Sequence, residues 1–541
     1  MAGYDDHLID EMDTLALSVN DELVVDDNIR AQLRKIEKDY ESIFSWDIQG
    51  SIGVNKNQMS SVIDKVREKT QLSIVMDAKG DGFNLTRFYL QLIVSYELYI
   101  RKSYKESYLE IERVIKFLET CAFNEHKQYA DAYHHIARAT YACIALMLPI
   151  DSEKLLKDIK DKNDFNEAEK SAVCAVKAKI FMEYSSKLNE IALICADEAR
   201  TLHSTEPEWT FIWLKAKGRV RRFNEPYKMP GDDEIKAADL LCSKRTSPFF
   251  LIKSSQLYKE AGFINKLKNN YKESDKFFKL SSDMAKISVE LAGDDVNHLN
   301  ILLLTCIECP DECFSKSMID NLVIKLSNVN NSWVDQVLGL YYLKNKKDYV
   351  KAKMYLSRGM AFGHFGSALQ LIKVECLLQS VKQFPFVDTL KGMYDNFQNQ
   401  NRRLVIIVQI LMYYTLVENN PKQILWYLKL YLDQDIEDIY KKRTLIFARP
   451  LFNADRYFKP NEFMNVLFGN IKELMNNNDW DINEKNTFDG LSKILKLSID
   501  DDDFNDKSWR KQKVNLSENK PNGSLQKKNE SWRKKKDSRH E

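Results

Sequence analysis

Apolar residues recur at spacings of three and four through most of this sequence, from about residue 86 to residue 440. A typical stretch carries Phe88, Leu92, Tyr96 and Tyr99 and is followed by a polar break and a second such stretch. This period places the apolar residues on one face of an α-helix, and two neighbouring stretches indicate an antiparallel helical hairpin. The chain has 17 Gly and 11 Pro in 541 residues, too few for the many tight turns of a β-sandwich or barrel. The sequence therefore predicts an all-α fold built from successive hairpins.

One hairpin fits a known repeat pattern, whose positions are Leu338, Gly339, Tyr342, Ala352, Leu356 and Gly359. In the tetratricopeptide repeat, a large residue followed by a small one, an aromatic three positions later and small residues on the second helix let two helices pack closely. The match here has one extra residue in the turn. Partial copies occur within 192–207, 258–285 and 414–431. Because such hairpins stack on one another, we predict a tetratricopeptide-like superhelix, or solenoid.

Composition divides the chain into three parts. Residues 1–85 are predicted to form an N-terminal helical cap, 86–500 the superhelix and 501–541 a disordered basic tail. Residues 507–541 contain 12 Lys or Arg and 4 Asp or Glu, a net charge of +8. The whole chain has a net charge of +1, so residues 1–506 carry +1 minus 8, or −7. The basic charge is therefore concentrated in the tail.

The tail contains one short motif twice. Trp509 and Arg510 belong to the first Ser-Trp-Arg-Lys copy, and Trp532 and Arg533 belong to the second. A tryptophan in a segment with few apolar residues has no core to fill, which favours a docking element for proteins or a nucleic-acid contact. The alternative is a solvated tail with a charge cluster typical of nuclear import.

Cysteine use and the N-terminus indicate the compartment. The nine cysteines are spread over a long chain, and most lie in apolar helical patterns, as expected in a reducing environment. The first residues are acidic, unlike a signal peptide, and the most apolar run, 404–417, is shorter than the roughly 20 residues of a membrane-spanning helix. We therefore expect a cytoplasmic protein without a membrane partner, with nuclear location as the alternative suggested by the basic tail.

The familiar catalytic motifs are missing from the sequence. There is no phosphate-binding loop, dinucleotide fingerprint, His-Glu-x-x-His or Gly-x-Ser-x-Gly. The one thiol cluster, Cys306, Cys309 and Cys313, lacks a fourth ligand at comparable spacing and is interrupted by Pro310. We therefore predict a binding protein that is not an enzyme and has neither a cofactor nor a metal.

A basic cluster suggests where a ligand binds. It consists of Lys215, Lys217, Arg219, Arg221 and Arg222, on a segment that also carries Trp213. The first helix of each hairpin in a solenoid lines the concave surface, so these cations would face a ligand. Arginine forks pair bidentately with phosphate oxygens. The alternative is a solvated helix face.

Three sequence anchors carry a family resemblance. They are Phe44-Ser45-Trp46-Asp47-Ile48, Pro207-Glu208 followed by Trp213 and Arg219, and Ser247-Pro248-Phe249-Phe250. In order and spacing, from about residue 30 to 290, the chain resembles the interferon-induced proteins with tetratricopeptide repeats. That resemblance implies a superhelix enclosing a basic tunnel for the 5′ end of single-stranded RNA, triphosphorylated or capped, in antiviral innate immunity.

The resemblance also implies individual site residues. The tunnel arginine corresponds to Arg219, and two polar family positions correspond to Ser61 and Lys65. An aromatic and basic pair of the family is approximated by Phe249 and Lys253. Where the family has a lysine after an apolar stretch, the aligned helix here offers Lys179, and the resemblance leaves open whether Lys179 replaces it.

The sequence thus predicts a single-stranded RNA-binding superhelix with a basic groove. Phosphate contacts are assigned to Ser61, Lys65, Lys215, Arg219, Arg222 and Lys253, and base stacking to Trp213 and Phe249. The rival prediction is a protein scaffold that binds acidic peptides, in which RNA is contacted by the tail alone or not at all. Protein partners of the superhelix or of the tail motif, the RNA end and the oligomeric state stay open.

Overall fold

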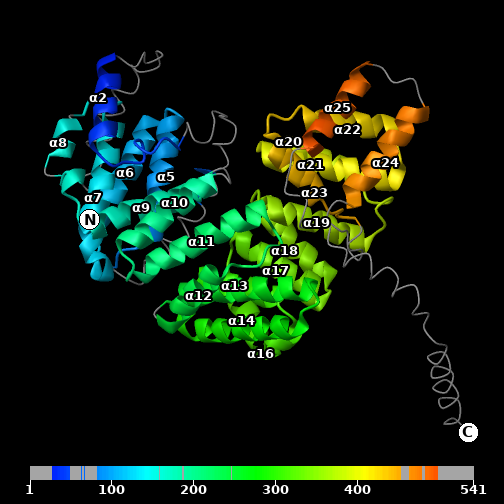
Figure 1. Cartoon of the computed structure of the whole chain (residues 1–541), viewed down its shortest axis with the longest axis horizontal. Coiled ribbons are helices and arrows are strands. Elements are labelled where there is room, and N and C mark those ends of the chain that lie inside the picture. The colour runs from blue at the N-terminus through cyan, green and yellow to red at the C-terminus, as the bar shows by residue number, and fades with distance from the viewer. Residues whose placement is uncertain are drawn as a thin grey trace, which may run out of the picture. The chain divides into compact units, whose positions relative to one another are not determined.

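The computed structural model describes residues 27–48, 62–63, 66–67, 82–150, 152–157, 159–184, 188–244, 247–452, 462–477 and 482–496. In these ranges the regular elements are helices, and the only β-type pairing is an isolated bridge between Gly82 and Ala122 (Figure 1). The predicted all-α, tetratricopeptide-like class is confirmed. The predicted tail, 501–541, lies outside the described residues.

The chain divides into two compact units. Unit 1 comprises 1–403 with 450–456, and unit 2 comprises 404–449 with 457–541. The division falls inside the segment 86–500, for which the sequence predicted one superhelix.

Unit 1 contains most of the helices. They are α2 (Asp27–Asp39), α5 (Leu85–Ile100), α6 (Tyr104–Thr120), α7 (Ala130–Ala145), α8 (Ser152–Leu156), α9 (Glu167–Phe181), α10 (Asn189–Leu202), α11 (Pro207–Asn224), α12 (Asp232–Lys244), α13 (Pro248–Leu267), α14 (Tyr271–Ala292), α15 (Val296–Glu308), α16 (Lys316–Ser327), α17 (Ser332–Tyr341), α18 (Tyr349–Ala361), α19 (Phe365–Leu378) and α20 (Phe386–Asn396). Unit 2 has α22 (Pro421–Leu432), α23 (Asp438–Ile446), α24 (Glu462–Asn477) and α25 (Ile482–Lys496), and α21 (Gln400–Tyr413) crosses the boundary.

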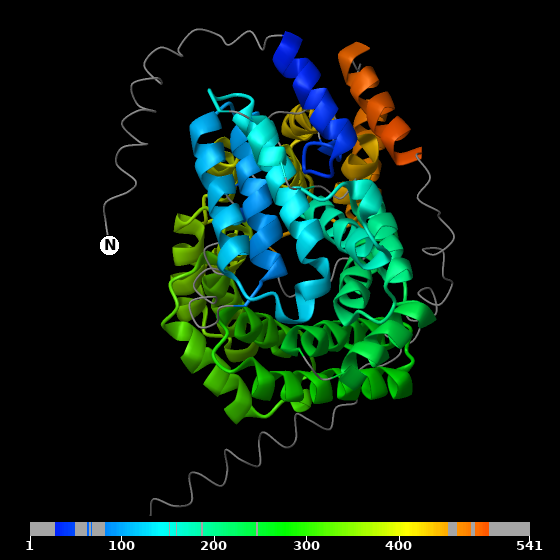
Figure 2. The same ribbon diagram turned by 90° about the vertical axis from the view of Figure 1, so that its left-hand side faces the viewer.

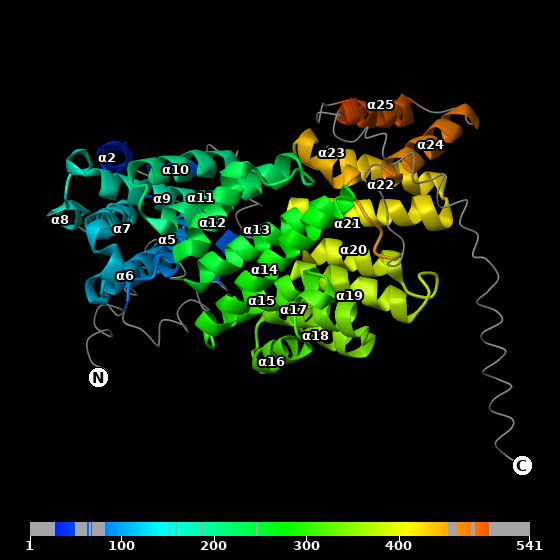
Figure 3. The same ribbon diagram turned by 60° about the horizontal axis from the view of Figure 1, so that its bottom comes forward.

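The helices of unit 1 pack as stacked hairpins. Each helix from α9 to α18 contacts the next one in the chain, and the pair α13 and α14 has the largest contact (Figures 2 and 3). In addition, each odd-numbered helix from α5 to α17 contacts the next odd-numbered helix. The first helices of the hairpins therefore form one continuous layer, which is the arrangement of a solenoid.

Local sequence explains where these helices begin and how closely they pack. Asn166 and Glu169 form a capping box at the start of α9, and α11 and α13 each begin with a proline after a capping side chain. On α9, Ala172, Ala175 and Ala178 are fully buried. These small side chains let α9 approach its neighbours closely.

The extra residue in the repeat around Gly339 is accommodated by a π-helical turn. Residues Tyr342–Lys346 form this turn directly after α17, and a π-turn holds more residues than an α-turn. The Tyr342 ring stacks on Tyr355 of α18 at 5.5 Å between centroids, with planes 5° apart. The hairpin therefore keeps its packing despite the insertion.

A second π-helical turn of the same kind lies between α21 and α22. There the π-turn is Tyr414–Glu418, and the Tyr414 ring stacks on Tyr427 at 5.6 Å between centroids. Each π-turn ends at a left-handed residue, Lys347 in the first and Asn419 in the second. The degenerate copy predicted around Tyr414 is thus a hairpin of the same construction.

The N-terminal segment, 27–48, is joined to the rest of unit 1 through His135 of α7. Its Nε2 accepts a hydrogen bond from the Glu41 amide at 2.9 Å, and its Nδ1 donates to the Lys160 carbonyl at 2.7 Å. Glu41 also accepts from Trp46 Nε1 at 2.7 Å and pairs with Lys177 at 2.9 Å. Both ring nitrogens of a neutral His135 are therefore used.

Candidate ligand site on helices α9, α11 and α13

Helix α11 presents cations on two sides. Lys217 and Arg221 lie one turn apart and face α12, where they pair with acidic side chains. Arg219 lies on the other side, and its guanidinium donates to the Met182 carbonyl at the end of α9. The five cations predicted as one ligand-facing cluster are thus divided between two environments.

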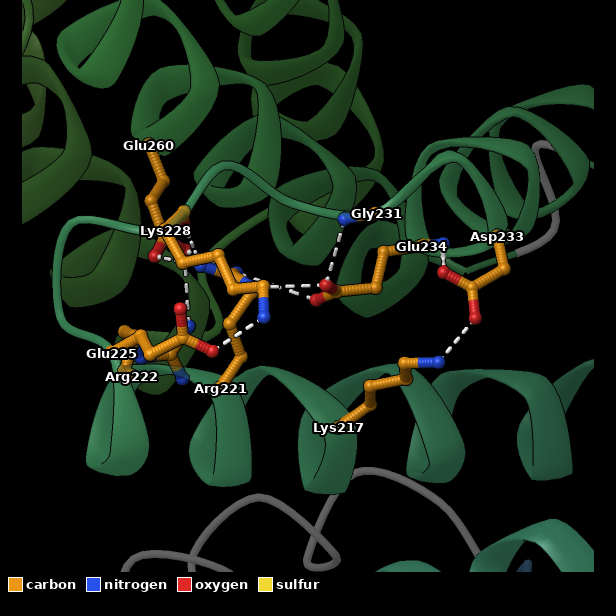
Figure 4. Close-up of polar contacts among 9 residues, drawn as sticks. All are labelled: Lys217, Arg221, Arg222, Glu225, Lys228, Gly231, Asp233, Glu234 and Glu260. Atoms are coloured by element: carbon orange, nitrogen blue, oxygen red, sulfur yellow. Dashed lines mark hydrogen bonds and ion pairs between the residues drawn. The ribbon is translucent and has the colours of Figure 1, made fainter. Parts of the chain in front are cut away.

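The side facing α12 is a closed ion-pair network centred on Arg221 (Figure 4). Its Nε donates to Glu234 at 2.8 Å, and its Nη1 donates to Glu260 at 2.7 Å and to the Lys228 carbonyl at 2.9 Å. Glu234 also accepts from the Gly231 amide at 3.1 Å. Arg221 is 8% exposed, so this network joins α11, α12 and α13 in the interior.

The charges in this network stabilise one another. Burial opposes the charge of Arg221, but its hydrogen bonds to Glu260 and Glu234 raise its pKa. Burial likewise opposes the charge of Glu260, but Arg221 and Arg222 lower its pKa below the usual value. Burial would raise the pKa of Asp233, but the ion pair with Lys217 outweighs burial and lowers this pKa. These groups act as structural pairs.

Arg222, a predicted phosphate residue, belongs partly to this network. Its Nη1 pairs with Glu260 at 3.1 Å, although 41% of its side chain is exposed. The guanidinium lies across Gly218, where an added Cβ would be 3.0 Å from Nη1. Lys217 and Arg221, predicted to face a ligand, instead pair with acids of α12 and α13. A phosphate contact by the more exposed Arg222 stays a prediction.

The side of α11 facing α9 has a different character. Burial lowers the pKa of Arg219, and the nearby Glu183 and Tyr89 only partly oppose this effect. Burial also lowers the pKa of Lys179, despite the acids Glu208 and Glu183 close to it. The Lys179 ammonium lies 5.1 Å from the centroid of the Tyr89 ring. Lys179, whose role the family resemblance left open, therefore lies close to Arg219.

Lys253 of α13 adds a third predicted residue to this region. Burial, followed by the charges of Arg222 and Arg219, lowers its pKa to about 7. Lys215, one turn before Arg219 on α11, interacts electrostatically with Glu208. We call Lys179, Lys215, Arg219 and Lys253 the α9–α13 cation cluster. It draws on three successive first helices of hairpins, the layer that lines the concave side of a solenoid.

Sequence reasoning missed the acids of both environments. Glu183 and Glu208 accompany the α9–α13 cation cluster, and Glu234 and Glu260 form the network with Arg221. The one available signal was the spacing of four between Lys179 and Glu183. Glu234 and Glu260 follow Arg221 by 13 and 39 residues, too far for a helical periodicity to connect them.

The two predicted stacking residues differ in exposure. Trp213 is 3% exposed, and the Arg200 guanidinium lies 3.9 Å from the centroid of its ring. This packing leaves no ring face for a base, so Trp213 is a core residue and its predicted stacking role is corrected. Phe249 is 37% exposed at the start of α13 and contacts the His298 ring. Stacking at Phe249 stays a prediction.

Several predicted site residues lie outside the described residues. These are Ser61 and Lys65 near the N-terminus and the tail residues Trp509, Arg510, Trp532 and Arg533. Their proposed roles stay predictions.

The thiol cluster is present without the features of a metal site. Cys306, Cys309 and Cys313 are free, and burial raises the pKa of the Cys309 thiol to about 11. Within the described ranges, no group of three or more His, Cys, Asp or Glu side chains is arranged to hold a metal ion.

Among the helices in the described ranges, none combines the length and apolar character needed to span a membrane.

Comparisons with known proteins give structural likeness only. No protein-family model matches the chain, and no curated protein matches it. The chain is similar to the human IFIT1 dimer with m7Gppp-AAAA, at 8% sequence identity and a TM-score of 0.45. It is also similar to the human IFIT1 dimer with PPP-AAAA, at 9% sequence identity and a TM-score of 0.46. A third similar structure is a monomeric IFIT1 mutant with Gppp-AAAA, at 9% sequence identity and a TM-score of 0.47. Each match covers 86% of this chain and 99–100% of the other. The resemblance noted in the sequence thus recurs among solved structures.

Proposed function

We propose that this protein is a non-enzymatic helical-repeat protein that binds the 5′-phosphorylated or capped end of single-stranded RNA at the α9–α13 cation cluster. The observation that carries the proposal is the convergence of Lys179, Arg219 and Lys253 from three successive first helices. A cytoplasmic role in antiviral defence would accord with this function.

The lowered pKa values of Lys179, Arg219 and Lys253 support an anionic ligand. A buried cation whose pKa is lowered lacks sufficient negative charge around it. A phosphate group would supply this charge, and the fixed donors of the Arg219 guanidinium suit its oxygens. Lys253, whose pKa is about 7, would take up a proton when the ligand binds. RNA affinity should therefore increase as the pH falls from 8 toward 6.5.

The experiment compares charge reversals in the full-length protein by fluorescence anisotropy. Arg219→Glu reverses a charge in the cluster, and Lys391→Glu makes the same change on α20, where 53% of the lysine side chain is exposed. We expect Arg219→Glu to weaken binding of a 5′-triphosphorylated single strand at least tenfold, roughly the loss of 1.4 kcal/mol or more. Lys391→Glu should leave the affinity within about twofold, because exposed pairs contribute little.

Further ligands and a deletion separate the alternatives. A 5′-hydroxyl strand of the same sequence tests the phosphate, and an acidic peptide with a free carboxylate tests the scaffold hypothesis. Affinity should fall steeply with salt, because phosphate neutralisation releases counterions. Unchanged RNA binding by Arg219→Glu, or tighter binding of the peptide than of the RNA, would show that the assignment is wrong. Loss of RNA binding on deletion of residues 504–541 would assign it to the tail.

A further inference from the structure

The corner between α22 and α23 in unit 2 concentrates negative charge. Residues 433–439, which we call the acidic corner, contain four acids and no Lys or Arg. Asp433, Asp435 and Glu437 are exposed, and Asp438 is partly buried. Within the described ranges, acids of this kind are nowhere arranged to hold a metal ion. The acidic corner therefore suits an extended cationic ligand.

Polar groups beneath the acidic corner do not neutralise it. The Lys441 ammonium is buried and donates to a backbone carbonyl at the end of α22 at 2.5 Å. Burial lowers the pKa of Lys441, and three carboxylates of the acidic corner only partly oppose this. The Tyr431 hydroxyl is also buried, and no described residue forms a hydrogen bond with it. Asp438 lies near this hydroxyl and adds to the effect of burial, which raises the pKa of Tyr431.

The acidic corner also offers an apolar contact. The Ile439 side chain, next to Asp438, is 43% exposed. A tryptophan ring that packs on such a side chain removes a large apolar area from water. A ligand that combines cations with one tryptophan therefore matches both properties of this surface.

The C-terminal tail starts close to the acidic corner in the same unit. Helix α25 contacts α22 and α23 (Figure 3), and a Cβ added at Gly490 of α25 would lie 3.5 Å from Leu432. Leu432 directly precedes the acidic corner. Helix α25 ends at Lys496, six residues after Gly490, which is about 9 Å along a helix.

The length of the tail allows its second Ser-Trp-Arg-Lys copy to reach this surface. Residues 497–541 lie outside the described ranges, and 36 residues lead from Lys496 to Trp532. A flexible chain of this length has a root-mean-square span of about 30–36 Å. Tethering over such a span gives an effective concentration on the order of 1 mM, so a weak contact suffices.

The second copy also has the charge that complements the acidic corner. Four consecutive cations follow Trp532, namely Arg533, Lys534, Lys535 and Lys536. The first copy, at Trp509, comes directly after five aspartates within 500–506, which offset its positive charge. The second copy is therefore the better ligand for four carboxylates.

We propose that residues 531–536 dock on the acidic corner of the same chain, with their cations paired to its carboxylates and Trp532 packed on Ile439. A cationic donor beside Asp438 also supplies a partner for the Tyr431 hydroxyl. While docked, these cations are withheld from nucleic-acid phosphates, so the acidic corner limits non-specific RNA binding by the tail. This inference goes beyond the proposed function and does not rest on it.

The test is site-specific photo-cross-linking in the full-length protein, followed by mass spectrometry. One protein carries p-benzoylphenylalanine in place of Ile439, and the control carries it in place of Trp426. Trp426 is 57% exposed on α22 of the same unit, and the exposed Lys422 and Lys429 lie one turn away on either side. Cross-links to 531–536 should be at least about fivefold more abundant from position 439, because like charges around position 426 repel the segment.

Matched charge reversals identify the tail copy that docks. Lys534→Glu combined with Lys536→Glu should reduce the cross-link yield from position 439 at least about threefold, since several weak pairs are lost together. Lys511→Glu combined with Lys513→Glu makes the same change in the first copy and should leave the yield nearly unchanged. Raising the salt from 0.1 M to 1 M shortens the Debye length from about 10 Å to about 3 Å and should also reduce the yield.

Three results would overturn the proposal. They are equal cross-linking to 531–536 from positions 439 and 426, equal effects of the two pairs of reversals, and cross-links that join a nitrogen-15-labelled chain to an unlabelled one. The last result would show that the acidic corner binds the tail of a second copy. The assay contains no RNA, so its failure leaves the proposed function untouched, and a failure of RNA binding leaves the docking of the tail untouched.

Discussion

Replacing Glu97 with glutamine should stabilise the protein at alkaline pH and leave it nearly unchanged at acidic pH. Glu97 lies on α5 and is fully buried. Neither of its carboxylate oxygens has a hydrogen bond of acceptable geometry with a described residue. Burial raises its pKa from 4.5 to about 7, although the adjacent Tyr184 hydroxyl and Arg101 act in the opposite direction. The ionised form is therefore costly in the folded state.

The size and direction of the effect follow from the pKa shift. The folded pKa is higher than the unfolded value, so the folded state binds more protons between pH 4.5 and about 7. The free energy of unfolding therefore falls as the pH rises through this window and stays low above it. Each pKa unit corresponds to about 1.4 kcal/mol, so the full penalty is on the order of 3 kcal/mol. Because the amide of glutamine also lacks hydrogen-bond partners, we expect Glu97→Gln to recover about 1–2 kcal/mol at pH 8.

Urea unfolding of the wild type and Glu97→Gln at pH 5 and pH 8 measures this difference. Glu290→Gln is the control, because Glu290 is exposed on α14 and should change the midpoint little at either pH. A difference between wild type and Glu97→Gln that is the same at both pH values would refute the reasoning. Destabilisation at pH 8 would show that the carboxylate is stabilised by its surroundings.

Two other perturbations test the fold. Burial lowers the pKa of His135 below 6.5, and the hydrogen bond to the Lys160 carbonyl only partly opposes this. The stability contributed by neutral His135 should therefore be present above pH 6.5 and lost below it. The hydrogen-exchange protection factors of residues 27–48 should be lower at pH 5 than at pH 7.5, and equal protection factors would contradict this. Gly339→Ala should lower the free energy of unfolding by about 1–3 kcal/mol, because the added Cβ would lie 2.6 Å from Leu356 Cγ. The melting temperature should recover partly in the double variant with Leu356→Ala. An unaltered melting temperature in Gly339→Ala would refute the tight packing.

Much of the fold was predictable because helical hairpins are encoded locally. The periodicity around Phe88 and the pattern Leu338, Gly339 and Tyr342 depend on residues within one or two turns of each other. The π-turns were visible only as an extra residue in the spacing. Whether an insertion is absorbed in a loop or in a widened turn depends on packing, here the stacking of Tyr342 on Tyr355, which links two helices.

The site was less predictable because the partners of its cations lie in other helices. The sequence predicted Arg219 and Lys253 as binding residues, and in the structure the charge of Arg219 affects the pKa of Lys253. It could not distinguish Arg219 from Arg221, which are two positions apart, because the distinction depends on Glu234 and Glu260. Trp213 was assigned to stacking for the same reason, since its burial arises from tertiary contacts.

The directions of the pKa shifts distinguish the side of α11 that faces α12 from the side that faces α9. Facing α12, the pKa of Arg221 is raised and that of Glu260 is lowered, so each group favours the charge of the other. Facing α9, the pKa values of Arg219 and Lys179 are lowered and that of Glu208 is raised, all chiefly by burial. Burial thus disfavours the charged form of each of these three groups, and such shifts are more typical of binding sites than of structural ion pairs. An arriving phosphate would favour the charged lysine and the neutral acid at once, so anion binding at this side of α11 should be accompanied by net proton uptake.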